Sequence, residues 1–225
     1  MPCGLNENVK LYQGPNHGSS SVELFPNQNV FAFGEKAVFR RGVFKDKNSK
    51  PSPKFQRLLV KVFVSNDDAE FEFWIHQHLY KQGPNMGIFH MFLLPSSMFI
   101  RGTFVAYQEP SRGTVSTLQK RIDSKSLHSP NLRLRFALCI AHALCNIKKA
   151  NVVHGNVVAA NIVVFKTQRG FEIAKLTGFN RMSSRVIQYP LHQHPNLHIG
   201  FQNDLKQFGH LLSSILYPTG FSLDE

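Results

Sequence analysis

The order of apolar patterns along the chain predicts an α+β fold with two lobes, the first rich in strands and the second rich in helices. Short runs of β-branched and aromatic residues dominate up to about residue 109. From residue 110 onward, apolar residues recur at spacings of three and four, which is typical of amphipathic helices. Apolar residues make up 42% of the 225 residues, enough for a sizeable core.

In the first lobe, residues 1–29 are polar and predict a loosely ordered arm, whose segment 22–25 packs onto the body. Residues 45–54 predict a basic loop. A helix should begin near Ser65, a candidate N-cap, and end near Tyr80, before a Gly-Pro pair at 83–84. Apolar runs predict the strands of the lobe at 30–33, 37–44, 55–63, 86–94 and 99–107.

The second lobe, residues 110–225, predicts three helices, one further strand and a long loop. The strand is expected at 171–176 and the loop at 181–203. The helices are expected at 115–122, 132–149 and 204–217.

Between the last two helices, residues 152–164 contain two β-branched runs around a polar loop with His154, Asn156 and Asn161. On local pattern this segment is a buried hairpin with turn formers, or a loop that holds side chains for binding or catalysis.

The formal net charge of +12 favours acidic partners such as nucleotides or phosphorylated proteins, or it reflects only a solvated basic surface. Basic residues do not alternate with aromatic residues, so a nucleic-acid groove is not indicated. The three cysteines form no C-x-x-C pair, no secretory signal is visible, and no apolar run is long enough to span a bilayer. We therefore expect a cytoplasmic or nuclear protein.

Lys61 lies inside the apolar run 58–63, where an ammonium group needs an anionic partner or loses its charge. Glu72 is the favoured partner, because the apolar residues three and seven positions later share its face of the expected helix. Glu70 is the rival partner. Alternatively, Lys61 extends to solvent from an edge strand.

Taken in order, these features resemble the protein kinase family from residue 30 to about residue 217. Lys61 and Glu72 resemble the family's strand lysine and helix glutamate. His154 and Asn161 match the His and the metal-binding Asn of the H-R-D-L-x-x-x-x-N motif. Asp204 matches the first residue of D-x-W-S-x-G, which implies that its carboxylate braces the backbone of the His154 loop. The His-Gly-Asn sequence is most similar to the pseudokinase domains of Janus kinases.

Several positions depart from the family pattern. Asn156 stands where the family has its catalytic Asp, and an amide cannot act as the base. Gly178 replaces the Asp that holds magnesium, and glycine offers no ligand, so we expect no metal site. Of the glycine-rich loop only Gly34 remains. The family's later helices are missing, so the resemblance implies a truncated, helical second lobe.

The resemblance therefore implies a catalytically degenerate pseudokinase that acts as a regulatory or decoy binding module for a kinase or a kinase partner and requires no cofactor. One alternative is ATP binding at Lys61, Glu72, Gly34 and Asn161, with or without weak phosphoryl transfer. Another is a basic module that binds nucleic acid or a membrane surface.

Overall fold

The computed structural model describes residues 21–24, 37–46, 54–81, 104–108, 115–166, 170–179, 182, 184–186 and 195–217. Its contacts divide the chain into two compact units, and the boundary between them falls inside helix α1 (Asn66–Lys81), after Phe73. Of the described residues, the first unit contains those up to Phe73 and 104–108, and the second contains 74–81 and all those from 115 onward. The described part is a mixed α+β structure with small antiparallel sheets and four α-helices.

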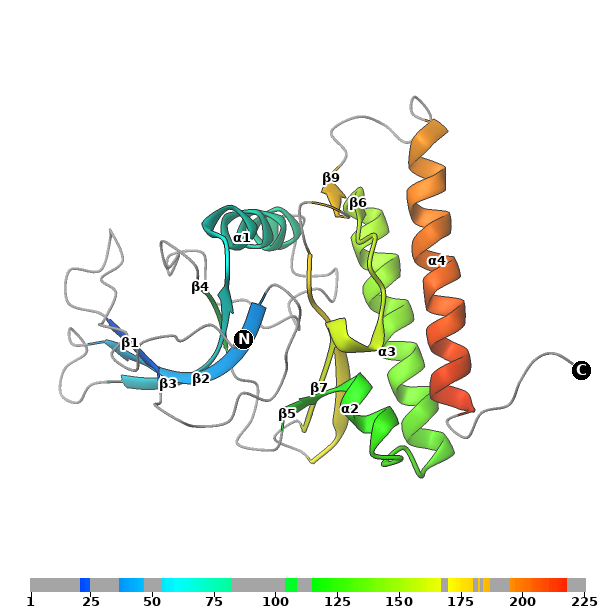
Figure 1. Ribbon diagram of the computed structural model, residues 1–225, viewed down its shortest axis with the longest axis horizontal. Helices are drawn as coiled ribbons and strands as arrows, with labels where there is room; N and C mark the ends of the chain where they lie inside the picture. The colour runs from blue at the N-terminus through cyan, green and yellow to red at the C-terminus, as the bar shows by residue number, and fades with distance from the viewer. Residues whose placement is uncertain are drawn as a thin grey trace, which may run out of the picture. The chain divides into compact units, whose positions relative to one another are not determined.

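The first unit contains a four-stranded antiparallel sheet in the order β1-β2-β3-β4 (Figure 1). β3 is central and buried on both faces, as the exposures of Leu59 and Val60, both 0%, show. From Leu58 to Phe63 its sequence is accordingly apolar at consecutive positions, apart from Lys61, rather than alternating. The strands are β1 (Ser21–Leu24), β2 (Ala37–Asp46), β3 (Lys54–Phe63) and β4 (Phe104–Gln108).

The second unit combines short strands with α3 and α4, which lie side by side in Figure 1. β7 pairs with both β5 and β8, whereas β6 pairs with β9. The elements are β5 (Val115–Thr117), α2 (Leu118–Asp123), α3 (Pro130–Lys149), β6 (Val152–Val153), the 3-10 helix η3 (Ala159–Asn161), β7 (Ile162–Lys166), β8 (Glu172–Leu176), β9 (Arg185–Val186) and α4 (Pro195–Leu216).

The structure confirms the predicted strands at 37–44, 55–63 and 171–176 and the helices near 65–80 and 132–149. Of the predicted strand 99–107, the described part begins at Phe104. The predicted strands at 30–33 and 86–94, Gly34 of the glycine-rich loop, the Gly-Pro pair at 83–84 and most of the basic loop lie outside the described residues.

Four expectations need correction. Residues 21–24 pack onto the body as expected, but they do so as a strand paired with β2 rather than as part of a loose arm. The segment 115–122 begins as a strand, because Val115 and Thr117 pair with β7. The segment 152–164 is not a hairpin, since its two apolar runs pair with other strands. α4 starts at Pro195, inside the predicted loop. Proline is tolerated in the first turn of a helix, so its presence there does not exclude a helix start.

Candidate functional site

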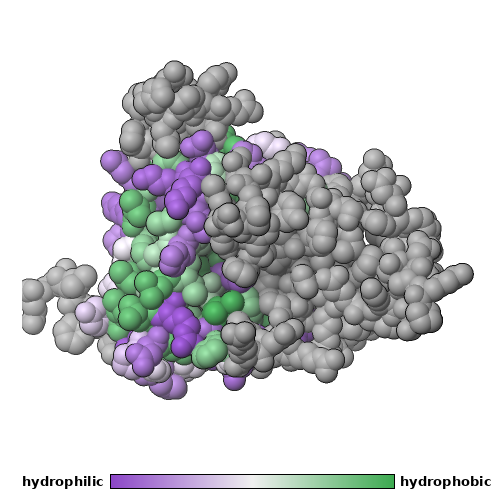
Figure 2. Space-filling model, turned by 180° about the vertical axis from the view of Figure 1, so that it is seen from behind, coloured by the Kyte–Doolittle hydropathy of each residue, from purple (hydrophilic) through white to green (hydrophobic). Residues whose placement is uncertain are grey.

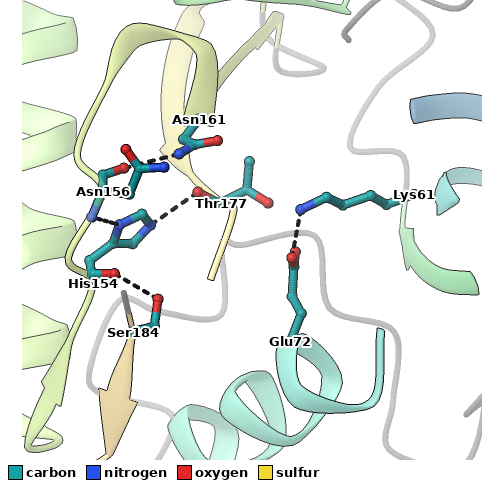
Figure 3. A network of polar contacts seen from close by, with 7 residues as sticks. All are labelled: Lys61, Glu72, His154, Asn156, Asn161, Thr177 and Ser184. Atoms are coloured by element: carbon teal, nitrogen blue, oxygen red, sulfur yellow. Dashed lines mark hydrogen bonds and ion pairs between the residues drawn. The ribbon is translucent and has the colours of Figure 1, made fainter. Parts of the chain in front are cut away.

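In the first unit, Lys61 of β3 and Glu72 of α1 form a buried ion pair. The ammonium Nζ lies 2.5 Å from Glu72 Oε2, and the two residues are 8% and 0% exposed (Figure 3). The rings of Phe39 and Phe63 lie on the same face of the sheet, with centroids 5.6 and 4.7 Å from Nζ. Direct cross-strand partners and residues two apart share a face of a sheet, which explains this aromatic enclosure.

This geometry decides between the alternatives left open for Lys61. β3 is a central strand, so extension to solvent from an edge strand is wrong. Glu70 is exposed, whereas Glu72 lies on the buried face of α1. When a buried ammonium and a buried carboxylate share a hydrogen bond, their attraction offsets part of the free-energy cost of removing both charges from water. The pair expected from the sequence is therefore present.

In the second unit, the His154 loop, defined here as residues 154–161, is held by the carboxylate of Asp204 on α4. The backbone amides of His154 and Gly155 donate to Asp204 Oδ2 and Oδ1 at 2.8 and 2.6 Å. Asp204 is 3% exposed, and burial raises its pKa above the ordinary 3.8, while these two hydrogen bonds act to lower the pKa. The predicted bracing of the loop by Asp204 is confirmed.

Further contacts fix the orientation of His154. Its Nε2 lies 3.0 Å from the carbonyl oxygen of Thr177, and Ser184 Oγ donates to the His154 carbonyl at 2.6 Å (Figure 3). The amide of Val157 donates to Gln207 Oε1 at 2.7 Å. Ser184 and Gln207 were not singled out from the sequence. Gln207 carries one recognisable signal, because it lies three residues after Asp204 and so shares its side of the helix.

Phe179, which follows Gly178, is fully buried in the second unit between two histidines. Its ring centroid is 4.7 Å from that of His154 and 5.4 Å from that of His76, with the latter pair edge to face. Edge-to-face and tilted ring contacts are favourable beyond the area they bury. His76 is thus a packing partner of the segment after β8.

The positions that match the base and the metal-binding residues of protein kinases hold two asparagines and a glycine, and therefore no carboxylate. Asn161 Nδ2 donates to the carbonyl of Asn156 at 3.0 Å, which closes the loop on itself. Gly178 has a φ of +88°, and a Cβ built there would lie 2.5 Å from Asn161 Oδ1. The side chain of Asn161 therefore fills the space that any residue larger than glycine would need at position 178.

These residues do not fit a magnesium ion. Mg²⁺ prefers carboxylate and phosphate oxygens in octahedral geometry. Asn156, Asn161, Thr177 and Gly178 provide no carboxylate, and a side chain at 178 is sterically excluded. In the described part of the chain, no three His, Cys, Asp or Glu residues cluster so that they could hold a metal ion.

Lys175 on β8 is a second buried lysine. It is 8% exposed, and its Nζ lies 5.2 Å from the centroid of the Phe165 ring. Burial lowers the pKa of Lys175 from 10.5 to about 7, and the neighbouring Cys139 acts to raise the pKa. This group titrates near neutral pH and makes stability dependent on pH.

No protein-family model matches the chain, and no curated protein matches it. Among the described helices, none is long and apolar enough to cross a membrane. The described elements form a structure of the α+β class.

Proposed function

We propose that this chain is a pseudokinase-like module that regulates a kinase, or a partner of a kinase, by docking rather than by phosphoryl transfer. The observation that carries the proposal is the contrast within the His154 loop. The loop is braced through Asp204 and oriented through Thr177 and Ser184, yet the positions for base and metal hold Asn156 and Gly178. Preorganisation without a base or a metal ligand suits binding and does not suit transfer.

The absence of transfer is tested by mass spectrometry of phosphosites after incubation with ATP and Mg²⁺. We expect no label on the chain or on a generic protein substrate, and none with Asn156→Asp. The Asn156→Asp variant restores a carboxylate at the base position but leaves the metal unheld. Label that appears in the wild-type chain and disappears in Lys61→Met would show that the chain is an enzyme.

The regulatory role is tested by adding the purified chain to kinases that co-purify with it from its native cells. We expect the activity of at least one such kinase to change with a saturable dependence on chain concentration. Asn203→Ala, an exposed substitution on α4, controls for the effect of a surface substitution as such and should change the kinase activity as the wild type does. Unchanged activity of every co-purifying kinase would reject the proposal.

A second candidate function is ATP binding without transfer, and the Lys61–Glu72 pair favours it. An ammonium group has three N–H donors, and one of them binds Glu72, so Lys61 is capable of further hydrogen bonds to phosphate oxygens. Ligand at about 100 times its Kd adds about 2.7 kcal/mol to stability, or roughly 5–10 °C in Tm. Because the His154 loop does not fit Mg²⁺, the shift should be the same with and without magnesium. No shift at millimolar ATP would exclude this function.

A further inference from the structure

An apolar strip crosses the surface of α3 and α4 in the second unit. On α3, Leu134 and Leu138 are 55% and 54% exposed, and on α4, Leu205 is 57% exposed. Partly exposed neighbours continue each line at spacings of three and four residues, so each line follows one face of its helix. We call these residues the α3–α4 strip: Leu134, Leu138, Ala141, Cys145, Leu205, Phe208, Leu212 and Leu216.

Two contacts show that α3 and α4 are antiparallel, so that the two lines run alongside each other. Arg133 Nη1 donates to the carbonyl of Leu216 at 2.9 Å, near the start of α3 and the end of α4. Lys148 Nζ lies 5.8 Å from the centroid of the Phe201 ring, near the opposite ends of both helices. Leu134 is therefore level with the last turn of α4, and Cys145 is level with the turn around Leu205.

The two lines lie on the same side of the helix pair. The other side of α4 faces the loop and β6, because Asp204 and Gln207 bind the His154 loop and Gly200 lies against Val153. The opposite face of α3 is buried through residues such as Ile140. Figure 2 shows hydrophobic surface gathered on the described part of this unit, bordered by hydrophilic surface.

The charges on these two helices are almost all positive. Their sequences contain five Lys or Arg residues and one carboxylate, Asp204, which is buried under the His154 loop. On α3 the four cations stand near the two ends, at 133, 135, 148 and 149, and residues 136–147 contain no Lys, Arg, Asp or Glu. The uncharged stretch is about 18 Å long at 1.5 Å per residue, which matches a helix of about three turns.

We propose that the α3–α4 strip is the docking surface for an acidic amphipathic helix of a partner protein. The apolar face of that helix would cover the strip, and Glu or Asp residues at both of its ends would meet the cations at both ends of α3. A second copy of this chain fits poorly, because a two-fold arrangement would bring the cations of both copies together. The inference rests on the proposed docking function and gives that function a surface and a partner chemistry.

The test uses a fluorescein-labelled synthetic peptide of about 18 residues, long enough to cover the uncharged stretch. Its leucines follow a three-and-four spacing, and its remaining residues are Ala and Glu. A control peptide of the same length and leucine spacing carries Lys at every Glu position. Fluorescence anisotropy against the full chain should show that the Glu peptide binds at least about tenfold more tightly than the Lys peptide. Equal affinities, or tighter binding of the Lys peptide, would overturn the proposal.

Matched variants locate the binding surface. Leu138→Glu and Leu205→Glu should each weaken binding of the Glu peptide by about tenfold or more, because the new carboxylate then faces the apolar side and the acidic residues of the peptide. Ile199→Glu is the control, since Ile199 is 53% exposed on α4 but lies six residues from Leu205, on another face. It should change the affinity by less than about twofold. Loss of binding in the control alone, or retained binding in both strip variants, would overturn the proposal.

Analytical ultracentrifugation addresses the second-copy alternative. A wild-type dimer that Leu138→Glu converts to a monomer would mean that the strip binds another copy, and the proposal would be wrong. Two outcomes distinguish a failure of this inference from a failure of the proposed function. If the strip variants still change the activity of a co-purified kinase as the wild type does, the surface is wrong and the function stands. If the peptide binds as expected and no kinase responds, the surface stands and the function fails.

Discussion

Replacement of Asp204 by alanine tests whether one carboxylate sets the conformation of the His154 loop. Asp204 accepts hydrogen bonds from the amides of His154 and Gly155 and is 3% exposed. Hydrogen bonds to charged groups contribute about 1.5–3 kcal/mol each. Burial disfavours the ionised carboxylate and raises its pKa, which places the expected loss at the low end of that range for each bond. We expect Asp204→Ala to lower the free energy of unfolding by about 3 kcal/mol.

For a chain of this length, such a loss corresponds to a fall in Tm of roughly 6–12 °C. Urea denaturation gives the free energy, and amide hydrogen exchange at residues 154 and 155 reports the loop directly. Asn203→Ala, the exposed neighbour on α4, should change the free energy by less than about 0.5 kcal/mol. The reasoning is refuted if Asp204→Ala remains within about 1 kcal/mol of the wild type and the two amides exchange at unchanged rates.

The same carboxylate makes a signed prediction about pH. Because the pKa of Asp204 is raised in the folded state, its proton favours folding. This contribution is complete below the unfolded value of 3.8 and is lost as the pH rises through the folded pKa. The stability of the wild type relative to Asp204→Asn should therefore decline across that window. A relative stability that rises with pH there would contradict the sign.

Three further predictions concern other buried groups. Lys61→Met leaves Glu72 buried without its cation and should lower the free energy of unfolding by about 3–5 kcal/mol. In a double-mutant cycle, adding Glu72→Leu should recover part of that loss, and additive losses would argue against a direct pair. Gly178→Ala should lower the free energy of unfolding by about 2–4 kcal/mol, because it adds positive-φ strain and a clash with Asn161. Adding Asn161→Ala should relieve only the clash, and full additivity of the two changes in urea denaturation would contradict this. The lowered pKa of Lys175 predicts that stability rises with pH from about 7 to 10.5. Lys175→Met should flatten this rise and stabilise the chain by roughly 2–4 kcal/mol at pH 6. An unchanged dependence of stability on pH in the variant would exclude Lys175 as the source of the rise.

Much of the candidate site could be predicted from local sequence. The apolar run around Lys61 indicates a strand that buries its lysine, and the spacing of apolar residues after Glu72 places that carboxylate on the buried face of α1. Asp204 could be placed at the His154 loop only through a resemblance between short motifs. Ser184 could not be found, because a serine in an irregular segment carries no pattern that names its hydrogen-bond partner.

By itself, the sequence determined the α+β class, the extents of β3, α1 and α3, and the lack of carboxylates at positions 156 and 178. These properties depend on residue type and on periodicity over one or two turns. Only the tertiary structure decided that the two apolar runs of 152–164 pair with different strands and that Asn161 occupies the space beside Gly178. Strand partners and close contacts depend on which surfaces meet after folding, and residues far apart in the chain determine that meeting.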